Sequence, residues 1–294
     1  MKQTILGAIY LSLAASIWGG MYVVSKYVLD FIPPLTLVWL RFIIAFVVLY
    51  GILKLAEKKQ KKKVTIRKKD WLLFAWIGFI GYFISITCQF IGTKLSDAHT
   101  GSLVTSATPA FMVIFAALIL KEKLTARRLL STIIATIGVI IVIGWDIEIG
   151  SYFIGTIILV GAAITWALLS IYVKTASARF SSLVITTYAI FFSLFFITPF
   201  MIWELQTSSI GTVNTYVILG VLYLGIVSTA GAFFLWNKGL DLMDASIGSL
   251  FFFFQPIVGS LLGWLLLNET LNSNFFIGGI LIICSVFITT FEKK

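Results

Sequence analysis

The chain has 294 residues, of which 60% are hydrophobic and 12% are charged, whereas a typical soluble domain is about half apolar and a quarter charged. This composition excludes a soluble globular protein, because a fold surrounded by water cannot bury so much apolar surface. The formal net charge of +10 does not indicate nucleic acid as a partner, since most basic residues flank apolar stretches, where they orient a membrane protein and contact anionic lipid headgroups.

Charged islands and turn residues divide the chain into ten apolar stretches, each close to the ~20 residues that cross the hydrocarbon core of a bilayer as a helix. We therefore predict an all-α integral membrane protein with ten transmembrane helices. In chain order the predicted spans are 5–27, 34–55, 71–92, 97–120, 127–145, 152–174, 180–203, 212–238, 244–267 and 272–291.

The loops predict the orientation of the chain in the membrane. When the ten spans are threaded in order, nearly all of the 22 Lys and Arg residues fall on the side of the N-terminus, and Lys26 and Lys94 fall on the other. Because loops rich in Lys and Arg stay inside, we expect both termini in the cytoplasm. The Lys-rich stretch 54–69 is interpreted first as a topology determinant, and second as a site for an anionic lipid.

The two halves of the sequence resemble each other. Residues 18–26 match residues 166–174, a shift of 148 (166 − 18), and the segment from Gly92 matches the segment from Gly239, a shift of 147 (239 − 92). The second register superposes four pairs of residues: Asp97 and Asp244, Gly101 and Gly248, Pro109 and Pro256, and Glu122 and Glu269. Since each copy holds five spans, an odd number, the second copy enters the membrane from the opposite side, which predicts inverted-topology repeats.

Inverted repeats are typical of secondary transporters, in which two exchangeable halves open a central site to either face in turn. The chain is similar to the EamA branch of the drug/metabolite transporter superfamily in WGGMYVVSK at 18–26, FIPPLTLVWLRF at 31–42, TPAF to KEKL at 108–124 and QPIV to NETL at 255–271. The resemblance implies two EamA domains of five helices each, here 1–145 and 152–291, in the bacterial inner membrane. It also implies export or exchange of small metabolites, amino acids among them, through a central cavity.

Two prolines lie in the middle of predicted spans, at equivalent positions of the two repeats. Pro109 and Pro256 each lack an amide, so each releases the carbonyl four residues earlier, at Thr105 and Phe252. A released carbonyl can bind a ligand, and a structural kink explains the same prolines equally well.

Two tryptophans lie deep in their spans, far from the interfaces where tryptophan usually anchors a helix. Trp18 and Trp166 each present an indole ring and an N–H group, so they are candidates for lining a substrate cavity, with helix packing as the alternative. Polar side chains at similar depth should face the bundle interior, where they contact substrate or bond to neighbouring helices. These are Gln89, Thr105, Ser106 and Gln255.

Arg41 is a charged side chain within a predicted span. An arginine at the centre of a bilayer costs about 3 kcal/mol on insertion scales. Snorkelling to the outer headgroups, or a structural ion pair, is the favoured interpretation, and substrate recognition is the alternative.

Four charged residues end spans at matched positions of the two repeats. Lys26 and Glu269 end spans on the predicted outer face, and their repeat-mates Lys174 and Glu122 end spans on the inner face. We predict that the pairs Lys26 with Glu269 and Lys174 with Glu122 alternate as outer and inner gates, against the simpler interpretation that exposed ion pairs contribute little.

The remaining motifs limit the function further. Gly259 and Gly263 form a GxxxG motif that can seat a neighbouring helix or a second copy, so we expect a monomer or a homodimer. No phosphate-binding loop, G-x-S-x-G motif or metal-binding cluster occurs, which predicts no cofactor, no metal and no enzyme activity.

The predicted function is a secondary transporter that moves a small organic metabolite, an amino acid or a related solute, by alternating access, as an exporter or exchanger. The alternatives are a flippase for a lipid-linked substrate and an efflux carrier for drugs or toxic compounds.

Overall fold

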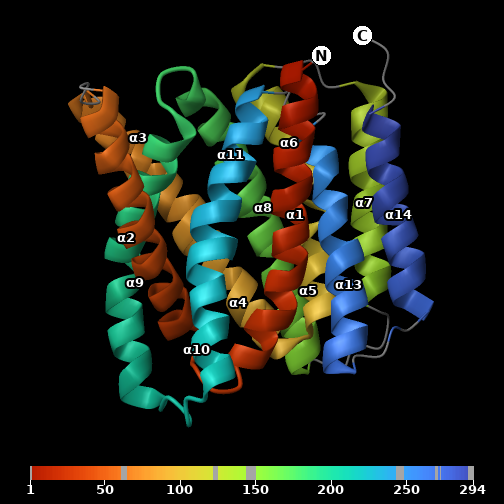
Figure 1. The fold of residues 1–294 in the computed structure, drawn as a ribbon. Coiled ribbons are helices and arrows are strands. Elements are labelled where there is room, and N and C mark those ends of the chain that lie inside the picture. Colours follow the sequence, from red (N-terminus) through yellow and green to blue (C-terminus); the bar gives the residue numbers. More distant parts are fainter. Residues whose placement is uncertain are drawn as a thin grey trace.

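A computed structural model describes residues 2–60, 65–121, 125–143, 150–242, 248–268, 271 and 273–290, and these residues form helices and no strands. Figure 1 shows a single bundle in which the long helices run side by side. Helices are expected of such an apolar chain, because in hydrocarbon every backbone amide and carbonyl must bond within its own segment. The helices are α1 (Lys2–Val28), α2 (Pro34–Gln60), α3 (Lys68–Ile77), η1 (Gly78–Ser85), α4 (Ile86–Leu95), α5 (Ala98–Thr105), α6 (Thr108–Ile119), α7 (Ala126–Ile143), α8 (Ser151–Ser177), α9 (Ser182–Thr207), α10 (Thr215–Leu222), η2 (Tyr223–Gly231), α11 (Ala232–Leu242), η3 (Ser249–Phe253), α13 (Phe254–Leu267) and α14 (Ser273–Thr290).

Seven helical segments among the described residues are long and apolar enough to cross a membrane. They confirm the all-helical fold class and coincide with seven of the ten predicted spans: Ile5–Val28, Pro34–Lys59, Lys68–Leu95, Ala98–Ile119, Ser151–Ser177, Ser182–Thr207 and Thr215–Leu242. The other three predicted spans, 127–145, 244–267 and 272–291, fall on α7, on η3 with α13, and on α14.

Two of the seven segments contain a π-helical stretch in their middle. In the segment from α3 to α4 the π-helix is η1, and in the segment from α10 to α11 it is η2. Neither segment contains proline. A π-helix bonds each amide to the carbonyl five residues earlier instead of four, and such turns are frequent at functional sites. The side chains of η1 and η2 are therefore candidates for a functional site.

Pro109 begins a new helix instead of bending a continuous one. Helix α5 ends at Thr105, and Pro109 lies in the first turn of α6, where a missing amide leaves no hydrogen bond unmade. The carbonyl of Thr105 is not bare, because it accepts a hydrogen bond from the Thr108 hydroxyl at 2.6 Å.

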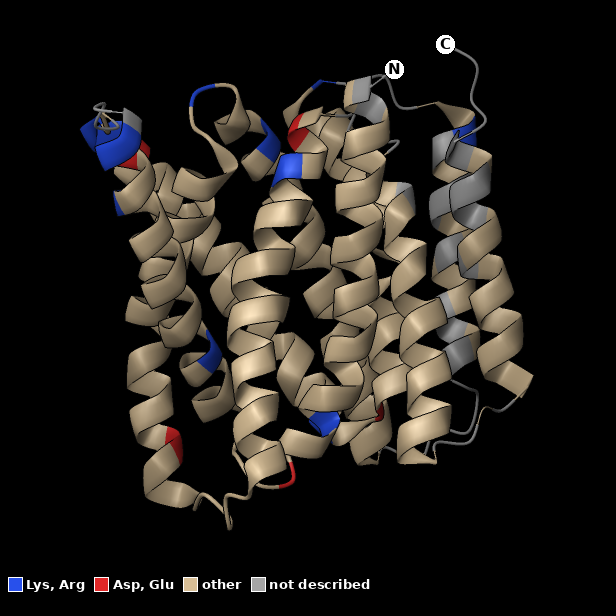
Figure 2. Ribbon diagram, in the orientation of Figure 1, with Lys and Arg blue, Asp and Glu red and all other residues tan. Residues whose placement is uncertain are grey.

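Both ends of the described chain lie at the same end of the bundle (Figure 1). Lys and Arg residues gather at this end, whereas few are found at the opposite end (Figure 2). Helix α1 runs away from the end that holds the termini, and α8 runs toward it. These two helices therefore point in opposite directions.

A buried carboxylate fixes the beginning of α2 at the end of the bundle opposite the termini. Glu204, near the end of α9, is 7% exposed and accepts hydrogen bonds from the Leu35 amide at 3.0 Å and the Thr36 amide at 2.7 Å. The Thr36 hydroxyl also donates to it, at 2.8 Å. A carboxylate is favourable here, because the first amides of a helix lack partners within the helix and carry a partial positive charge.

Glycines allow α1 to approach α13 closely. A Cβ atom added to Gly19 would lie 2.7 Å from the Gln255 carbonyl oxygen and 2.9 Å from the Gly259 amide nitrogen. Gly259 itself faces Ser102, whose Cβ would lie 2.6 Å from an added Cβ. This glycine of the GxxxG motif therefore packs against helices of its own chain.

We expect Gly19→Ala to lower the free energy of unfolding by about 1–3 kcal/mol, because the new methyl group overpacks a contact made partly by rigid backbone. Gly51→Ala is the matched control, since an added Cβ at this helical position meets no atom within 4 Å. Thermal unfolding of the purified proteins in detergent measures the difference. Equal midpoints for the two variants would show that α1 and α13 are not in close contact.

Candidate functional site

A cavity lies in the middle of the bundle. The surrounding side chains leave free room in it for about one water molecule. Helices from both halves of the chain contribute to its wall. The lining residues are Trp18, Met21, Ser85, Ile86, Gln89, Thr105, Thr108, Ala162, Trp166, Phe233, Phe252 and Gln255.

The structure brings six of the eight predicted substrate-binding residues together around this cavity, namely Trp18, Gln89, Thr105, Trp166, Phe252 and Gln255. The two prolines are not part of its wall. Pro109 starts α6, and Pro256 lines a separate apolar groove of about 510 Å³ between α13 and α14.

An aromatic box of six rings lies beside the cavity, and four of its rings, Trp18, Trp166, Phe233 and Phe252, line the cavity wall. It consists of Trp18, Tyr82, Trp166, Phe233, Trp236 and Phe252. The ring centre of Trp18 lies 5.3 Å from that of Trp166 and 5.2 Å from that of Trp236. The Trp18 N–H donates to the Ser228 carbonyl at 3.1 Å, so the central indole is fixed in place. Such rings offer a large apolar contact surface and negative faces that attract an ammonium group.

Sequence reasoning missed half of this box: Tyr82, Phe233 and Trp236. The internal repeat carries a signal that points to two of them. The shift of 147 relates Gln89 to Trp236 (236 − 89) and Ile86 to Phe233 (233 − 86). Applied to Gln89, the repeat thus identifies Trp236 as a mid-depth aromatic residue that faces the interior.

Polar side chains form the other side of the cavity. The Thr105 hydroxyl bonds to the Tyr22 hydroxyl at 2.7 Å and accepts from the Gln255 amide at 2.6 Å. The Gln89 amide donates to the Tyr22 hydroxyl. Two buried polar atoms at the cavity have no hydrogen-bond partner within the described part of the chain, the Trp166 N–H and the Gln89 side-chain oxygen. The site thus offers a solute one free donor and one free acceptor.

Arg41 lies in the interior of the bundle and is 0% exposed, so its side chain does not snorkel to the surface. Its Nε donates to the Thr229 hydroxyl at 2.7 Å. Its guanidinium carbon lies 4.8 Å from the centre of the Phe90 ring, a distance at which cation–π attraction is significant.

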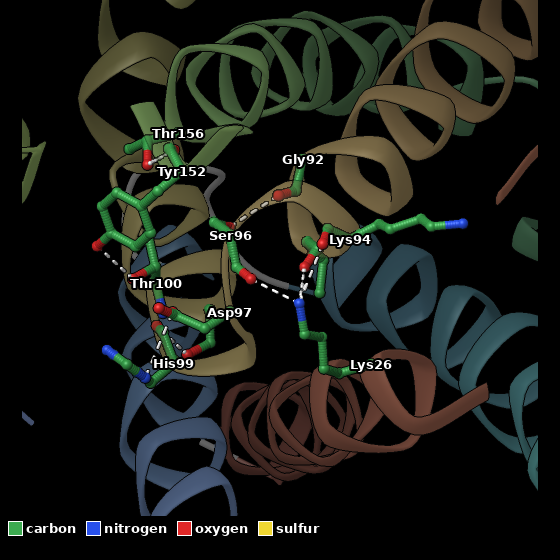
Figure 3. A network of polar contacts seen from close by, with 11 residues as sticks. Lys26, Gly92, Lys94, Ser96, Asp97, His99, Thr100, Tyr152 and Thr156 are labelled. Carbon is green, nitrogen blue, oxygen red and sulfur yellow. Dashed lines mark hydrogen bonds and ion pairs between the residues drawn. The ribbon is translucent and has the colours of Figure 1, made fainter. Parts of the chain in front are cut away.

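Lys26 bonds to backbone oxygens instead of a carboxylate among the described residues. Its Nζ donates to the carbonyls of Thr93, Lys94 and Ser96 at 3.1, 3.0 and 2.6 Å (Figure 3). These carbonyls end helix α4, where the helix dipole favours a positive charge. Lys174 makes a similar contact at the end of α11, donating to the Leu240 carbonyl at 2.8 Å.

The two predicted gating partners, Glu122 and Glu269, lie outside the described residues. The Lys–Glu gates therefore stay a prediction. The structure gives each lysine another acceptor, a backbone carbonyl at the end of a helix in the same half of the chain.

We expect Lys26→Met to lower the free energy of unfolding by about 1–2 kcal/mol, because three carbonyls lose a charged donor. Lys94→Met is the matched control, since the Lys94 side chain points away from this network (Figure 3) and an exposed substitution of this kind changes stability by at most about 0.5 kcal/mol. Unfolding midpoints of the purified variants in detergent give the comparison. A lysine that acts only through Glu269 would leave Lys26→Met as stable as Lys94→Met.

A polar network continues from Lys26 along the start of α5 (Figure 3). Asp97 caps α5 by accepting from the Thr100 amide at 2.8 Å, and its carboxylate lies 3.3 Å from Nδ1 of His99. The Thr100 hydroxyl bonds to the Tyr152 hydroxyl at 3.0 Å, which joins α5 to α8. No group of three or more His, Cys, Asp or Glu residues that could hold a metal ion occurs in the described ranges.

Comparison with known proteins gives three results. The model of the EamA-like transporter family matches residues 5–144 and 153–291. The uncharacterized transporter YetK of Bacillus subtilis is 29% identical over 291 residues, which cover 97% of this chain and 87% of YetK. A probable amino-acid metabolite efflux pump of Escherichia coli is 26% identical over 292 residues, which cover 96% of this chain and 94% of that protein.

A solved crystal structure also has the same fold. It superposes with a TM-score of 0.69 at 19% sequence identity, and the match covers 97% of this chain and 96% of the other.

Proposed function

This chain belongs to the EamA-like transporter family, and on that premise we propose that it moves a small organic metabolite across the membrane by alternating access. The cavity carries this proposal, because helices from both halves of the chain wall it and its polar and aromatic groups suit an organic solute. With room for about one water molecule, the cavity must widen to admit a solute. Such a contracted site suits an occluded state between the two open ones.

The proposed architecture is ten transmembrane helices in two inverted repeats, residues 1–145 and 152–291. Four pairs of cavity residues related by the repeat support it: Trp18 and Trp166, Ile86 and Phe233, Thr105 and Phe252, and Thr108 and Gln255. The lysine contacts support it too, since the shifts of 148 and 147 relate Lys26 and Thr93 to Lys174 and Leu240.

The proposed orientation places both termini in the cytoplasm of a bacterial cell. The gathering of Lys and Arg at the end of the bundle that holds the termini supports it (Figure 2), because positively charged loops stay on the cytoplasmic side. The same basic residues would contact anionic lipid headgroups.

The proposed cargo is a neutral, zwitterionic or amphipathic solute, with amino acids first. The aromatic box suits an apolar body or an ammonium group, and the free donor and acceptor suit polar ends. The name of the Escherichia coli relative supports an amino-acid metabolite and the direction of export. No described acidic residue lines the cavity, so we propose that the solute gradient or exchange drives transport.

Transport by purified protein in sealed vesicles tests the proposal. Vesicles are loaded with each member of a panel of amino acids and related metabolites, and efflux and exchange are followed with and without proton and sodium gradients. We expect saturable movement of at least one solute that needs no ion gradient. Movement of none of them above protein-free vesicles would refute an amino-acid-type metabolite as cargo.

A flippase for a lipid-linked substrate is the second candidate. The open apolar groove between α13 and α14 favours it, because a lipid tail could occupy such a groove while a headgroup crosses the bundle. Movement of a fluorescent lipid between leaflets of the same vesicles distinguishes this candidate from solute transport.

A further inference from the structure

We propose that Arg41 binds a carboxylate group of the transported solute. The inference rests on the proposed function and makes it more specific, because it assigns a negative charge to the cargo and a residue that recognises this charge.

Arg41 is a buried cation without a described counter-ion. Its side chain is 0% exposed, and no carboxylate of the described residues lies within ion-pair distance of it. The described ion pairs instead join other residues, at the ends of the bundle. Burying a charge without a partner is costly, so an embedded arginine in a membrane protein points to a function that requires it.

The guanidinium is only partly satisfied by the groups around it. Its Nε makes a short hydrogen bond to the Thr229 hydroxyl at 2.7 Å. The other two nitrogens have weaker partners: Nη1 faces the Met21 sulfur at 3.5 Å, and Nη2 lies 3.4 Å from the Ser228 hydroxyl. Sulfur is a poor acceptor, whereas the edge formed by Nη1 and Nη2 matches the two oxygens of a carboxylate.

Aromatic rings stabilise the charge while no anion is bound. The guanidinium carbon lies 4.8 Å from the Phe90 ring centre, 5.8 Å from that of Phe233 and 5.9 Å from that of Phe42. Rings attract a cation by their negative faces but cannot neutralise it. The guanidinium thus remains available to an anion.

Only a thin wall separates Arg41 from the cavity. The Met21 sulfur lies 3.5 Å from Nη1 and the Phe233 ring centre lies 5.8 Å from the guanidinium carbon, and both residues line the cavity. Methionine is unbranched and flexible, so rotation of the Met21 side chain away from Nη1 would open the carboxylate-binding edge to the solute. The solute would then place its carboxylate at Arg41 and its body against the aromatic box.

The π-helical segment η2 links the two ends of this site. Ser228 and Thr229 of η2 accept hydrogen bonds from Arg41, and the Ser228 carbonyl accepts the N–H of Trp18 in the aromatic box. A solute that contacts both Arg41 and the aromatic box would therefore contact two groups whose positions are fixed by the same short segment, η2.

The test compares carboxylates with their uncharged carboxamides. The probes are phenylalanine with phenylalaninamide and leucine with leucinamide, and the readout is the protection of purified protein in detergent against thermal unfolding as probe concentration rises. We expect the wild-type protein to bind at least one acid about tenfold more tightly than its amide. The preference should disappear in Arg41→Met and persist in weakened form in Arg41→Lys, which keeps a charge but not the planar fork.

Arg179→Met is the matched control, because Arg179 pairs with Asp70 at 2.8 Å at the end of the bundle. This variant should leave the preference for the acid unchanged. Ligand-free Arg41→Met should unfold at or above the temperature of the wild type, since an apolar side chain of similar length removes a buried charge. A large fall in its unfolding temperature would assign Arg41 a structural role and overturn the proposal. So would equal binding of acid and amide, or protection by neither.

The outcome also separates this inference from the proposed function. Tighter binding of the acids with no transport in vesicles would keep the Arg41 site and refute the transport of these solutes. Transport of acids and amides at equal rates, unaffected by Arg41→Met, would keep the transporter and refute the site.

Discussion

Replacing Glu204 by alanine is expected to lower the free energy of unfolding by about 3–5 kcal/mol. The substitution leaves the amides of Leu35 and Thr36 and the Thr36 hydroxyl without their acceptor, and a buried donor without a partner costs about 1–3 kcal/mol. Reversible unfolding of the purified protein in mixed micelles of increasing denaturing detergent measures the change.

Glu57→Ala is the control for this prediction. Glu57 is also a helical glutamate, but it pairs with the largely exposed Lys54 at 2.8 Å, and such surface pairs contribute about 0.2–1 kcal/mol. A loss for Glu204→Ala no greater than that for Glu57→Ala would show that water, and not Glu204, satisfies the start of α2.

Trp18→Phe is expected to reduce the transport rate per folded protein by about tenfold or more. Phenylalanine keeps one ring but leaves the Ser228 carbonyl without the indole N–H that it accepts at 3.1 Å, and it shrinks the ring that contacts Trp166 and Trp236. The loss of about 1 kcal/mol for the hydrogen bond, together with weaker ring contacts, gives a change of this size. Exchange of radiolabelled solute in vesicles, normalised to monodisperse protein, measures it.

The control is Trp264→Phe, because Trp264 is 55% exposed on α13 and belongs to none of the cavity residues. It makes the same chemical change on the exposed surface of the bundle. If both variants transport as fast as the wild type, the aromatic box does not bind the solute.

The helical class and seven spans were predictable because hydrocarbon demands internal backbone bonding over a length that the sequence displays directly. Five cavity residues were predictable for a related reason: Trp18, Gln89, Thr105, Trp166 and Gln255 are bulky or polar at a depth where lipid does not explain them. The sixth, Phe252, was predicted only because Pro256 releases its carbonyl. The sequence repeat supported part of the choice, since it relates Trp18 to Trp166, and both line the cavity.

Contacts between distant segments were not predictable. Glu204 lies 168 residues from Thr36, and its acceptor role depends on how α9 packs against α2. The partners of Lys26 are backbone carbonyls, which every residue type carries, so no sequence pattern marks them. Arg41 shows a third limit. Its depth in the sequence predicted the cost of placing a charge in the membrane. Whether the side chain is buried in the bundle or snorkels to the surface depends on its neighbours, which the sequence does not give.

The paired π-helical segments have a mechanical consequence. Each of η1 and η2 holds an extra residue in a wide turn. If the wide turn moves by one position along the helix, one hydrogen bond breaks for each one that forms. The residue passed over then rotates by about 100° about the helix axis. A helix of this kind can rotate one of its halves relative to the other without a proline hinge. Spin labels placed on either side of each wide turn should report two discrete separations, where a uniform α-helix would give one.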